Sequence, residues 1–154
     1  MSTIQQRLQD AGVILPPAPK PVAAYVPWVR AGDLVFVSGQ IPMSEGVVTV
    51  EGPVPSRVTP DEAAAAARLC VVNAMAVLAD ALDGDLDRVR RIVRLGVFVA
   101  SDPGFYGQPQ VANGASELLL EIFGEAGRHA RAAVGSVALP LGATVEVEMV
   151  AEAR

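Results

Sequence analysis

The sequence contains few of the residues that build disulfide frameworks and metal sites. Among its 154 residues there is one cysteine, Cys70, and one histidine, His129. A single cysteine excludes a disulfide framework within the chain and is typical of a cytoplasmic protein. With one histidine and no cluster of cysteines or carboxylates at ligand spacing, we expect no metal site. Cys70 lies in an apolar, helix-like run, which predicts an inert, packed thiol.

Positive charge is also scarce. The chain has 12 Lys and Arg residues against 17 Asp and Glu, a formal net charge of −5. This balance opposes binding to a phosphate backbone, so we expect no nucleic-acid partner. Neither a GxxxxGK phosphate loop nor a GxSxG nucleophile elbow occurs, and we expect no organic cofactor.

Long uncharged apolar runs are missing as well. The longest apolar stretches are interrupted by Arg68, Asn73 and Asp80, which argues against a membrane span. The first residues, MSTIQQRLQDAG, are polar and do not resemble a signal peptide, so we expect a cytoplasmic protein without a membrane partner.

Apolar residues are nevertheless abundant, at 51% of the chain with a mean hydropathy of +0.38. The length suits one domain over residues 1–154, with an N-terminal helix and connector (1–20) before a core (21–152). An apolar chain of this size often buries its excess in a subunit interface.

Periodicity and turn residues predict an α+β fold with the order β-β-β-α-β-α-β-β after a short first helix. Thr59 and Pro60 predict the beginning of a helix, and Gly84 predicts its end. Gly114 inside the second long helix suggests a packing reason for its missing side chain. We expect helices at 3–12, 60–83 and 109–123, a proline-rich connector at 15–21, and strands at 25–30, 34–40, 47–50, 92–100, 131–138 and 144–151.

The strand at 92–100 is apolar on both faces. Val93, Leu95, Val97 and Val99 share one face, while Ile92, Phe98 and Ala100 are expected on the other. Helices can cover one face, and a second subunit is the simplest cover for the other.

The tail from His129 to Ala151 carries the candidate chemistry. If its two strands pair as a hairpin-like unit, the guanidinium of Arg131 and an outward carboxylate of Glu146 or Glu148 can face one cleft. Such a pair could hold a small carboxylate and place a water. The Glu/Val alternation also fits an ordinary half-exposed strand, and His129 also fits a solvent-exposed loop.

Two segments carry a family resemblance. Residues 25–42, YVPWVRAGDLVFVSGQIP, resemble the YxxxVxxGxxxFxSGQxP signature of the RidA/YjgF family of reactive-intermediate deaminases, also labelled endoribonuclease L-PSP. The tail, with Ala130-Arg131, Val134, Leu139-Pro140 and the VEVE run from Val145, is similar to the family's closing ARxxVxxxxLPxxxxVEIE pattern.

The resemblance implies a chorismate-mutase-like fold, assembled as a homotrimeric barrel with clefts at the subunit boundaries. It implies hydrolysis of enamine or imine carboxylates of the 2-aminoacrylate type to 2-keto acids and ammonia, without cofactor. In those clefts the arginine matching Arg131 binds the substrate carboxylate, and the glutamate matching Glu146 positions the water. Other matching positions line the pocket: Tyr25, Ser38, Gly39, Asn113 and Ala133.

This sequence departs from the family pattern at two notable positions. Ala133 stands where many members have a cysteine, and Trp28 is expected near the cleft entrance, where smaller residues are common. These departures indicate a divergent branch. They favour an alternative in which the same cleft binds a keto acid as a signal without catalysis, while a ribonuclease or translation inhibitor is the weakest interpretation.

Overall fold

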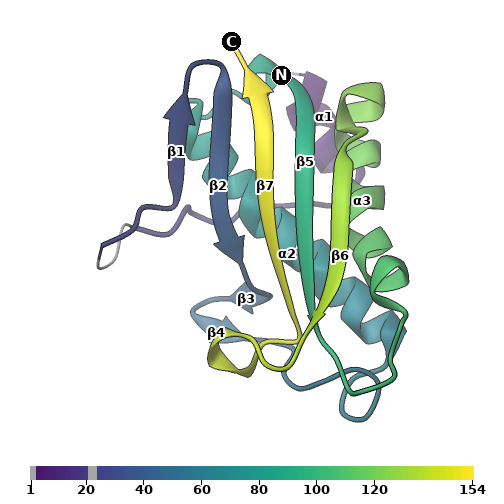
Figure 1. Cartoon of the computed structure of the whole chain (residues 1–154). Coiled ribbons are helices and arrows are strands. Elements are labelled where there is room, and N and C mark those ends of the chain that lie inside the picture. The colour runs from purple at the N-terminus through teal and green to yellow at the C-terminus, as the bar shows by residue number, and fades with distance from the viewer. Residues whose placement is uncertain (1–2, 21–23) are drawn as a thin grey trace.

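The computed structural model describes residues 3–20 and 24–154, and its centre is a mixed five-stranded sheet covered by helices on one face (Figure 1). The strand order is β1-β2-β7-β5-β6, in which only β5 and β6 run parallel. The strands are β1 (Trp28–Ala31), β2 (Leu34–Gln40), β5 (Val89–Ala100), β6 (Ala130–Ser136) and β7 (Val145–Ala153). The helices are α1 (Thr3–Asp10), α2 (Pro60–Ala81) and α3 (Gln108–Phe123). The predicted α+β architecture, with two long helices on one face of the sheet, is confirmed.

The long helix α2 forms where its sequence signals predict. The Thr59 hydroxyl accepts a hydrogen bond from the Glu62 backbone N–H at 3.1 Å, and Pro60 is the first helical residue. Beyond the other end, Gly84 adopts a positive φ of 85° and donates to the Ala79 carbonyl at 2.8 Å. By length and composition α2 could cross a membrane, but in this fold it is a largely buried core helix.

Helices α2 and α3 touch where Gly114 has no side chain. A Cβ at Gly114 would overlap the backbone carbonyl of Ala64 on α2. The packing reason predicted for this glycine is therefore confirmed, because only glycine lets the two helix backbones come so close.

Strand β5 contains an irregularity that changes one predicted face. The pairing register with β7 shifts between Ile92 and Arg94, so one extra residue is accommodated there. Ile92 and Leu95 are both fully buried, each opposite a buried residue of β7. The prediction that Ile92 faces away from Leu95 was wrong, because the shift interrupts strict alternation.

The two tail strands do not pair with each other. Strand β6 lies at the sheet edge, parallel to β5, while β7 is inserted between β2 and β5. The hairpin-like pairing considered for the tail is therefore wrong. Strand β5 separates the two segments because β5, α3 and β6 form a parallel crossover unit that places β6 on the outside.

Two early strands also differ from their predicted extents. Strand β1 begins at Trp28 rather than at residue 25, since Pro27 has no N–H to donate to a ladder. The strand expected at 47–50 is the short β4 (Val47–Val48), which pairs only with β3 (Met43–Ser44) around Gly46. This small hairpin lies outside the main sheet.

The N-terminal helix α1 is anchored to the core. Asp87 accepts hydrogen bonds from the backbone N–H groups of Thr3 and Ile4, at 3.2 and 2.9 Å. Arg7 donates to the Ile122 carbonyl at 3.1 Å, and Ile4 and Leu8 are buried. From α1 the connector crosses behind the strands towards β1 (Figure 1). Residue 21, the last of the predicted connector, lies outside the described residues.

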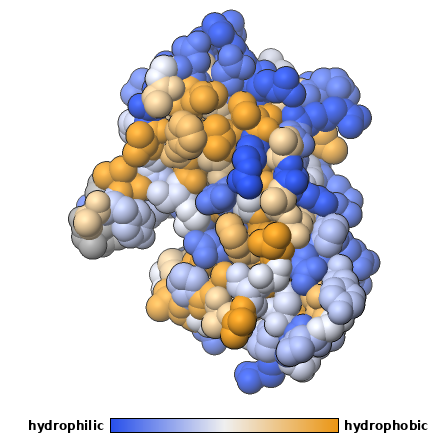
Figure 2. Space-filling model, viewed as in Figure 1, coloured by the Kyte–Doolittle hydropathy of each residue, from blue (hydrophilic) through white to orange (hydrophobic). Residues whose placement is uncertain are grey.

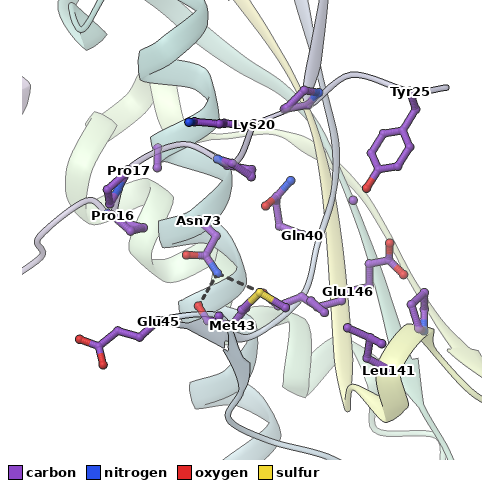
Figure 3. Close-up of a pocket in the computed structure, with 17 residues that line it drawn as sticks. Pro16, Pro17, Lys20, Tyr25, Gln40, Met43, Glu45, Asn73, Leu141 and Glu146 are labelled. Carbon is purple, nitrogen blue, oxygen red and sulfur yellow. Dashed lines mark hydrogen bonds between the residues drawn. The ribbon is translucent and has the colours of Figure 1, made fainter. Parts of the chain in front are cut away.

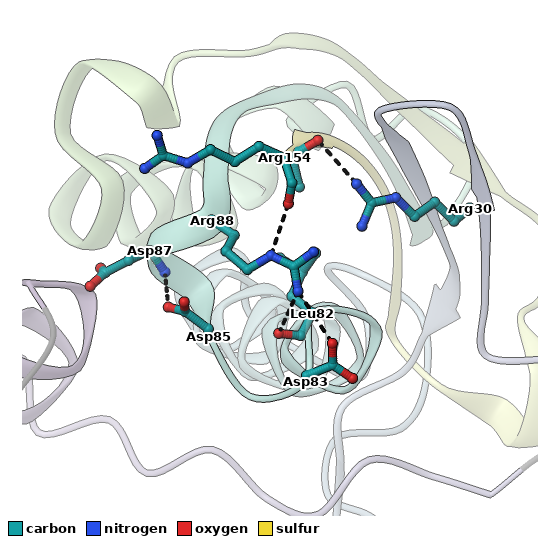
Figure 4. A network of polar contacts seen from close by, with 8 residues as sticks. Arg30, Leu82, Asp83, Asp85, Asp87, Arg88 and Arg154 are labelled. Carbon is teal, nitrogen blue, oxygen red and sulfur yellow. Dashed lines mark hydrogen bonds and ion pairs between the residues drawn. The ribbon is translucent and has the colours of Figure 1, made fainter.

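A second polar network holds the end of β7 (Figure 4). Arg88 donates to the carbonyl of Arg154 at 2.8 Å and forms an ion pair with Asp83. Arg30 of β1 donates to the carbonyl of Ala153 at 3.2 Å. These contacts fasten the end of the central strand to both of its sides.

The face of the sheet that the helices leave open is rich in apolar side chains. Figure 2 shows apolar residues gathered over the strands on this face. Val29, Phe36 and Val134 are exposed there, and Phe98 and Val150 are half-buried. The half-exposed Arg94–Glu148 ion pair lies among these residues, so the open face combines apolar patches with charge, as interaction faces often do (Figure 2).

Candidate functional site

The residues expected to form one site lie around two separate hollows. The larger hollow has a volume of about 550 Å³ and contains Tyr25, Gly39 and Glu146 in its walls. The smaller has a volume of about 220 Å³ and is lined by Ser116, Leu120, Arg128, His129 and Arg131. None of the described residues lines both hollows.

The carboxylate of Glu146 fits into the larger hollow because one residue of β2 has no side chain there. A Cβ at Gly39 would overlap the carboxylate of Glu146. The register of β2 against β7 shifts between Val37 and Gln40, so the bulge and the missing side chain together admit the carboxylate. The carboxylate of Glu146 is thus the group that comes closest to the backbone of Gly39.

The environment of Glu146 favours its protonated form. Burial raises the pKa of the Glu146 carboxyl above its ordinary value, and the nearby negative charge of Glu148 raises it further. A carboxyl with a raised pKa is a stronger proton acceptor than an ordinary carboxylate.

Tyr25 lines this hollow, and Ser38 supports it from outside. Tyr25 is exposed and lies across the hollow from the hairpin, on the same side as Glu146 (Figure 3). Ser38 does not line the hollow; its hydroxyl donates to the Val26 carbonyl at 2.7 Å. That bond fastens the segment that carries Tyr25 to β2.

Arg131 is fixed by helix α3. Its Nη1 donates to Asn113 Oδ1 at 2.8 Å and to Ser116 Oγ at 3.1 Å. Among the described residues, no hydrogen bond uses its Nε or Nη2. The Nε–Nη2 edge of the guanidinium is therefore available for a carboxylate, which can accept two parallel bonds.

His129 continues this chain of hydrogen bonds. Its Nδ1 lies 2.6 Å from the Gly127 carbonyl, which can only accept, so Nδ1 carries the proton. In the neutral ring, Nε2 accepts from the Ser116 hydroxyl at 2.9 Å, and Ser116 in turn accepts from Arg131. Burial lowers the pKa of His129, and the charge of Arg131 lowers it further against the opposing bond to Gly127. His129 is half-buried and bonded rather than a free loop side chain.

Within one chain, Arg131 and Glu146 lie on opposite faces of the sheet. Arg131 is opposite Leu95, which is buried beneath the helices, and it bonds to α3. Glu146 alternates with Val145 and Val147, which are fully buried, and is opposite Phe98. The expectation that the guanidinium and a tail carboxylate share a cleft is therefore wrong within one subunit. Glu148 instead forms an ion pair with Arg94 at 3.3 Å.

The remaining residues that the sequence singled out lie in the sheet or the core rather than around the hollows. Ala133 is half-buried on β6 opposite Val97 and lines neither hollow. Trp28 lines neither hollow; its indole N–H donates to Asp80 at 2.9 Å, and the ring packs on the core. Cys70 is buried as predicted, and burial raises the pKa of its thiol, with the charge of Glu146 as a smaller cause.

Sequence reasoning missed several residues around these hollows. Ser116, which links Arg131 to His129, lies three positions after Asn113 on one helix face, so helical spacing could have identified it. Asn73 of α2 and the connector prolines line the larger hollow, and no sequence signal pointed to them. Among residues 3–20 and 24–154, no group of three or more His, Cys, Asp or Glu could hold a metal ion.

Known proteins show the same fold and sequence pattern. Residues 5–153 match the family model described as "YjgF/chorismate_mutase-like, putative endoribonuclease". The protein TCP17 of Trypanosoma cruzi is 46% identical over 97% of this chain and 93% of its own length.

Solved structures agree with this assignment. The protein Atu1372 of Agrobacterium tumefaciens, described as having unknown function, is 45% identical with a TM-score of 0.91, covering 98% of this chain and 92% of its own. TdcF of Escherichia coli, solved with bound serine, is 25% identical with a TM-score of 0.61, covering 89% and 94%. The chain therefore belongs to the YjgF/RidA family, whose fold it shares.

Proposed function

We propose that this protein hydrolyses small enamine and imine carboxylates to 2-keto acids and ammonia, in clefts formed between the three subunits of a homotrimer. The observation that carries the proposal is the division of the site into two halves on opposite faces of one sheet. Arg131 offers an unoccupied guanidinium edge, while Glu146 offers a carboxyl with a raised pKa. Neither half can complete the chemistry alone, so a neighbouring copy must supply the other.

The surface of the chain supports an assembly of this kind. Strand β6 is an unpaired sheet edge with an exposed Val134, and exposed edges are normally covered in stable proteins. The apolar open face described above adds to the area available for burial (Figure 2). Closed cyclic symmetry would present β6 of each subunit to its neighbour.

The chemistry requires a held carboxylate and one oriented water. Arg131 would bind the substrate carboxylate through Nε and Nη2, leaving the C=N carbon near Glu146 of the neighbouring subunit. Glu146 would accept a proton as water adds to that carbon and deliver it to the nitrogen, which gives a carbinolamine. Glu146 would then take the carbinolamine's hydroxyl proton and pass it to the nitrogen, so that the C–N bond breaks, the C=O bond forms and ammonia leaves. The overall change is R–C(=NH)–COO⁻ plus H₂O to R–C(=O)–COO⁻ plus NH₃. An enamine first becomes the imine by taking a proton at its terminal carbon and losing one from its nitrogen.

Mixed trimers test both the reaction and the shared cleft. Arg131→Ala and Glu146→Gln chains carrying different tags would be co-expressed and purified over both tags. Every mixed trimer then has one cleft with an intact arginine and an intact glutamate, so we expect about one third of the wild-type rate of imine clearance. Each single variant alone should keep about 1% of the wild-type rate or less. Mixed trimers without activity would contradict the shared cleft, and an active Arg131→Ala homotrimer would contradict the mechanism.

A second candidate is binding of a small carboxylate without catalysis. TdcF, a relative, was solved with bound serine, and this chain has Ala133 where many members have a cysteine. Saturable binding of 2-ketobutyrate, with no acceleration of any imine above its spontaneous rate, would select this function. Ribonuclease activity is disfavoured by the net charge of −5, and it would require RNA cleavage that Arg131→Ala abolishes.

A further inference from the structure

The larger hollow offers far more space than a three-carbon imino acid fills. Its volume of about 550 Å³ lies within the range of pockets that enclose ligands of drug size. Tyr25 and Glu146 occupy one side of it, and the rest extends beneath the connector towards Pro16 and Pro17 (Figure 3). The extension is continuous with the proposed reaction site.

The walls of this extension are mainly apolar. Pro17 and Pro19 come from the connector, Ala76 from α2, and Ile41 and Met43 from the segment after β2. Lys20 and Glu45 are the charged side chains besides Glu146 in the lining. A lining of this composition favours an apolar group over water.

The walls are also held in place. Asn73 on α2 donates to the carbonyls of Ile41 and Met43 at 3.1 and 3.0 Å, which fixes the loop that forms one wall (Figure 3). The connector is anchored at its start by the bonds of α1 to Asp87, and its prolines have restricted φ angles. A wall of this kind is formed before a ligand arrives.

We infer that the hollow beneath the connector is a subsite for the substrate's side chain, and that this protein prefers imino acids with unbranched apolar side chains of four or more carbons. This inference rests on the proposed function, because it takes the carboxylate and imine of the substrate to lie at the Arg131 and Glu146 end. The connector, with Ala76 and Met43, is then the determinant of specificity.

The first experiment measures binding along a homologous series. Calorimetric titration of the full-length protein with pyruvate, 2-ketobutyrate and 2-ketohexanoate should give a Kd that falls about fourfold with each added methylene. Between pyruvate and 2-ketohexanoate this amounts to roughly 60-fold. In parallel, imines produced from alanine and from norleucine by an amino-acid oxidase should show the same order in kcat/KM.

Variants of the wall separate the subsite from the reaction site. Ala76→Leu should fill the hollow and weaken 2-ketohexanoate binding at least tenfold while leaving pyruvate binding unchanged. Ala65→Leu is the matched control, because Ala65 lies on the same helix but is exposed and outside the lining. Met43→Ala, which needs no extra space in the core, should reduce the gain in affinity per methylene.

The outcomes distinguish this inference from the proposed function. Equal Kd values along the series, or equal effects of Ala76→Leu on short and long ligands, would overturn the subsite even if alanine-derived imine is hydrolysed. A steep dependence on chain length without hydrolysis of any imine would support the subsite and overturn the deaminase proposal.

Discussion

The two halves of the candidate site are built in different ways. The half with Arg131 is made by neighbouring elements, α3 and β6, and its side chains are joined by a continuous chain of hydrogen bonds from Asn113 to Gly127. The half with Glu146 is made by segments far apart in the sequence, and it is shaped by a missing side chain and an apolar wall. One half therefore fixes the orientation of a charge, and the other provides space and shifts a pKa.

The largest effect should come from removing the fixed charge. Arg131→Ala should lower kcat/KM for imine hydrolysis by roughly 100- to 1,000-fold, because a charge-assisted pair with the substrate carboxylate is lost. The control is Arg128→Ala, since Arg128 lines the same small hollow but is paired with Glu125. Comparable losses in both variants would mean that general positive charge, rather than the Arg131 fork, matters.

A smaller loss is expected from closing the space that Glu146 uses. Gly39→Ala would place a methyl group where the carboxylate lies, and the displaced group should lower kcat by about 10- to 100-fold. The change should have little further effect in a Glu146→Gln background, which a double-mutant cycle would measure. Additive losses would show that Gly39 acts independently of Glu146.

A third prediction concerns the packing that carries α3, and with it Asn113 and Ser116. Gly114→Ala should lower the free energy of unfolding by about 1–3 kcal/mol, although alanine is the better helix former, because its Cβ meets the Ala64 carbonyl. Urea unfolding would measure this. Ala65→Gly, at an exposed position of α2, should cost about 1 kcal/mol through propensity alone. A stabilised Gly114→Ala protein would contradict the close helix contact.

The smallest effect concerns the pH dependence of stability. The pKa of His129 is lowered in the folded state, so the unfolded chain binds the proton more readily. Stability from this group is complete above the unfolded value of about 6.5 and declines as the pH falls below it. His129→Gln should therefore lose less stability than the wild type between pH 7 and pH 5, as measured by urea unfolding at each pH. Equal losses would indicate that His129 titrates normally.

The sequence predicts those parts of this comparison that depend on local patterns. Helix α2 follows from Thr59, Pro60 and Gly84, and the alternation of Val145, Glu146 and Val147 assigns the faces of β7 correctly. The order of the strands in the sheet could not be predicted, because alternation specifies which face a side chain occupies but not which strand lies beside it. For this reason the sequence could not show that β5 separates Arg131 from Glu146. The register shift beside Ile92 depends on how β5 pairs with β7, so no local sequence pattern predicts it.

The candidate site was predictable to a similar extent. The motifs selected Arg131, Glu146, Tyr25 and Gly39, and the structure brings the last three around one hollow. The contribution of the connector could not be predicted, because it depends on α1 docking against residues more than 80 positions away. The hydrogen bond of Trp28 could not be predicted for the same reason, since its partner Asp80 lies on a distant helix.

The bonds of Arg131 to α3 also bear on the entropy of ligand binding. A free arginine side chain has roughly 2 kcal/mol of rotamer entropy to lose when it becomes ordered. Here Nη1 is already held by Asn113 and Ser116, so much of that loss occurs during folding rather than on binding. A lysine at this position has a single nitrogen and could not bond to the helix along one edge while offering a second edge to a carboxylate. The two-sided shape of the guanidinium thus lets one side chain serve both the fold and the ligand.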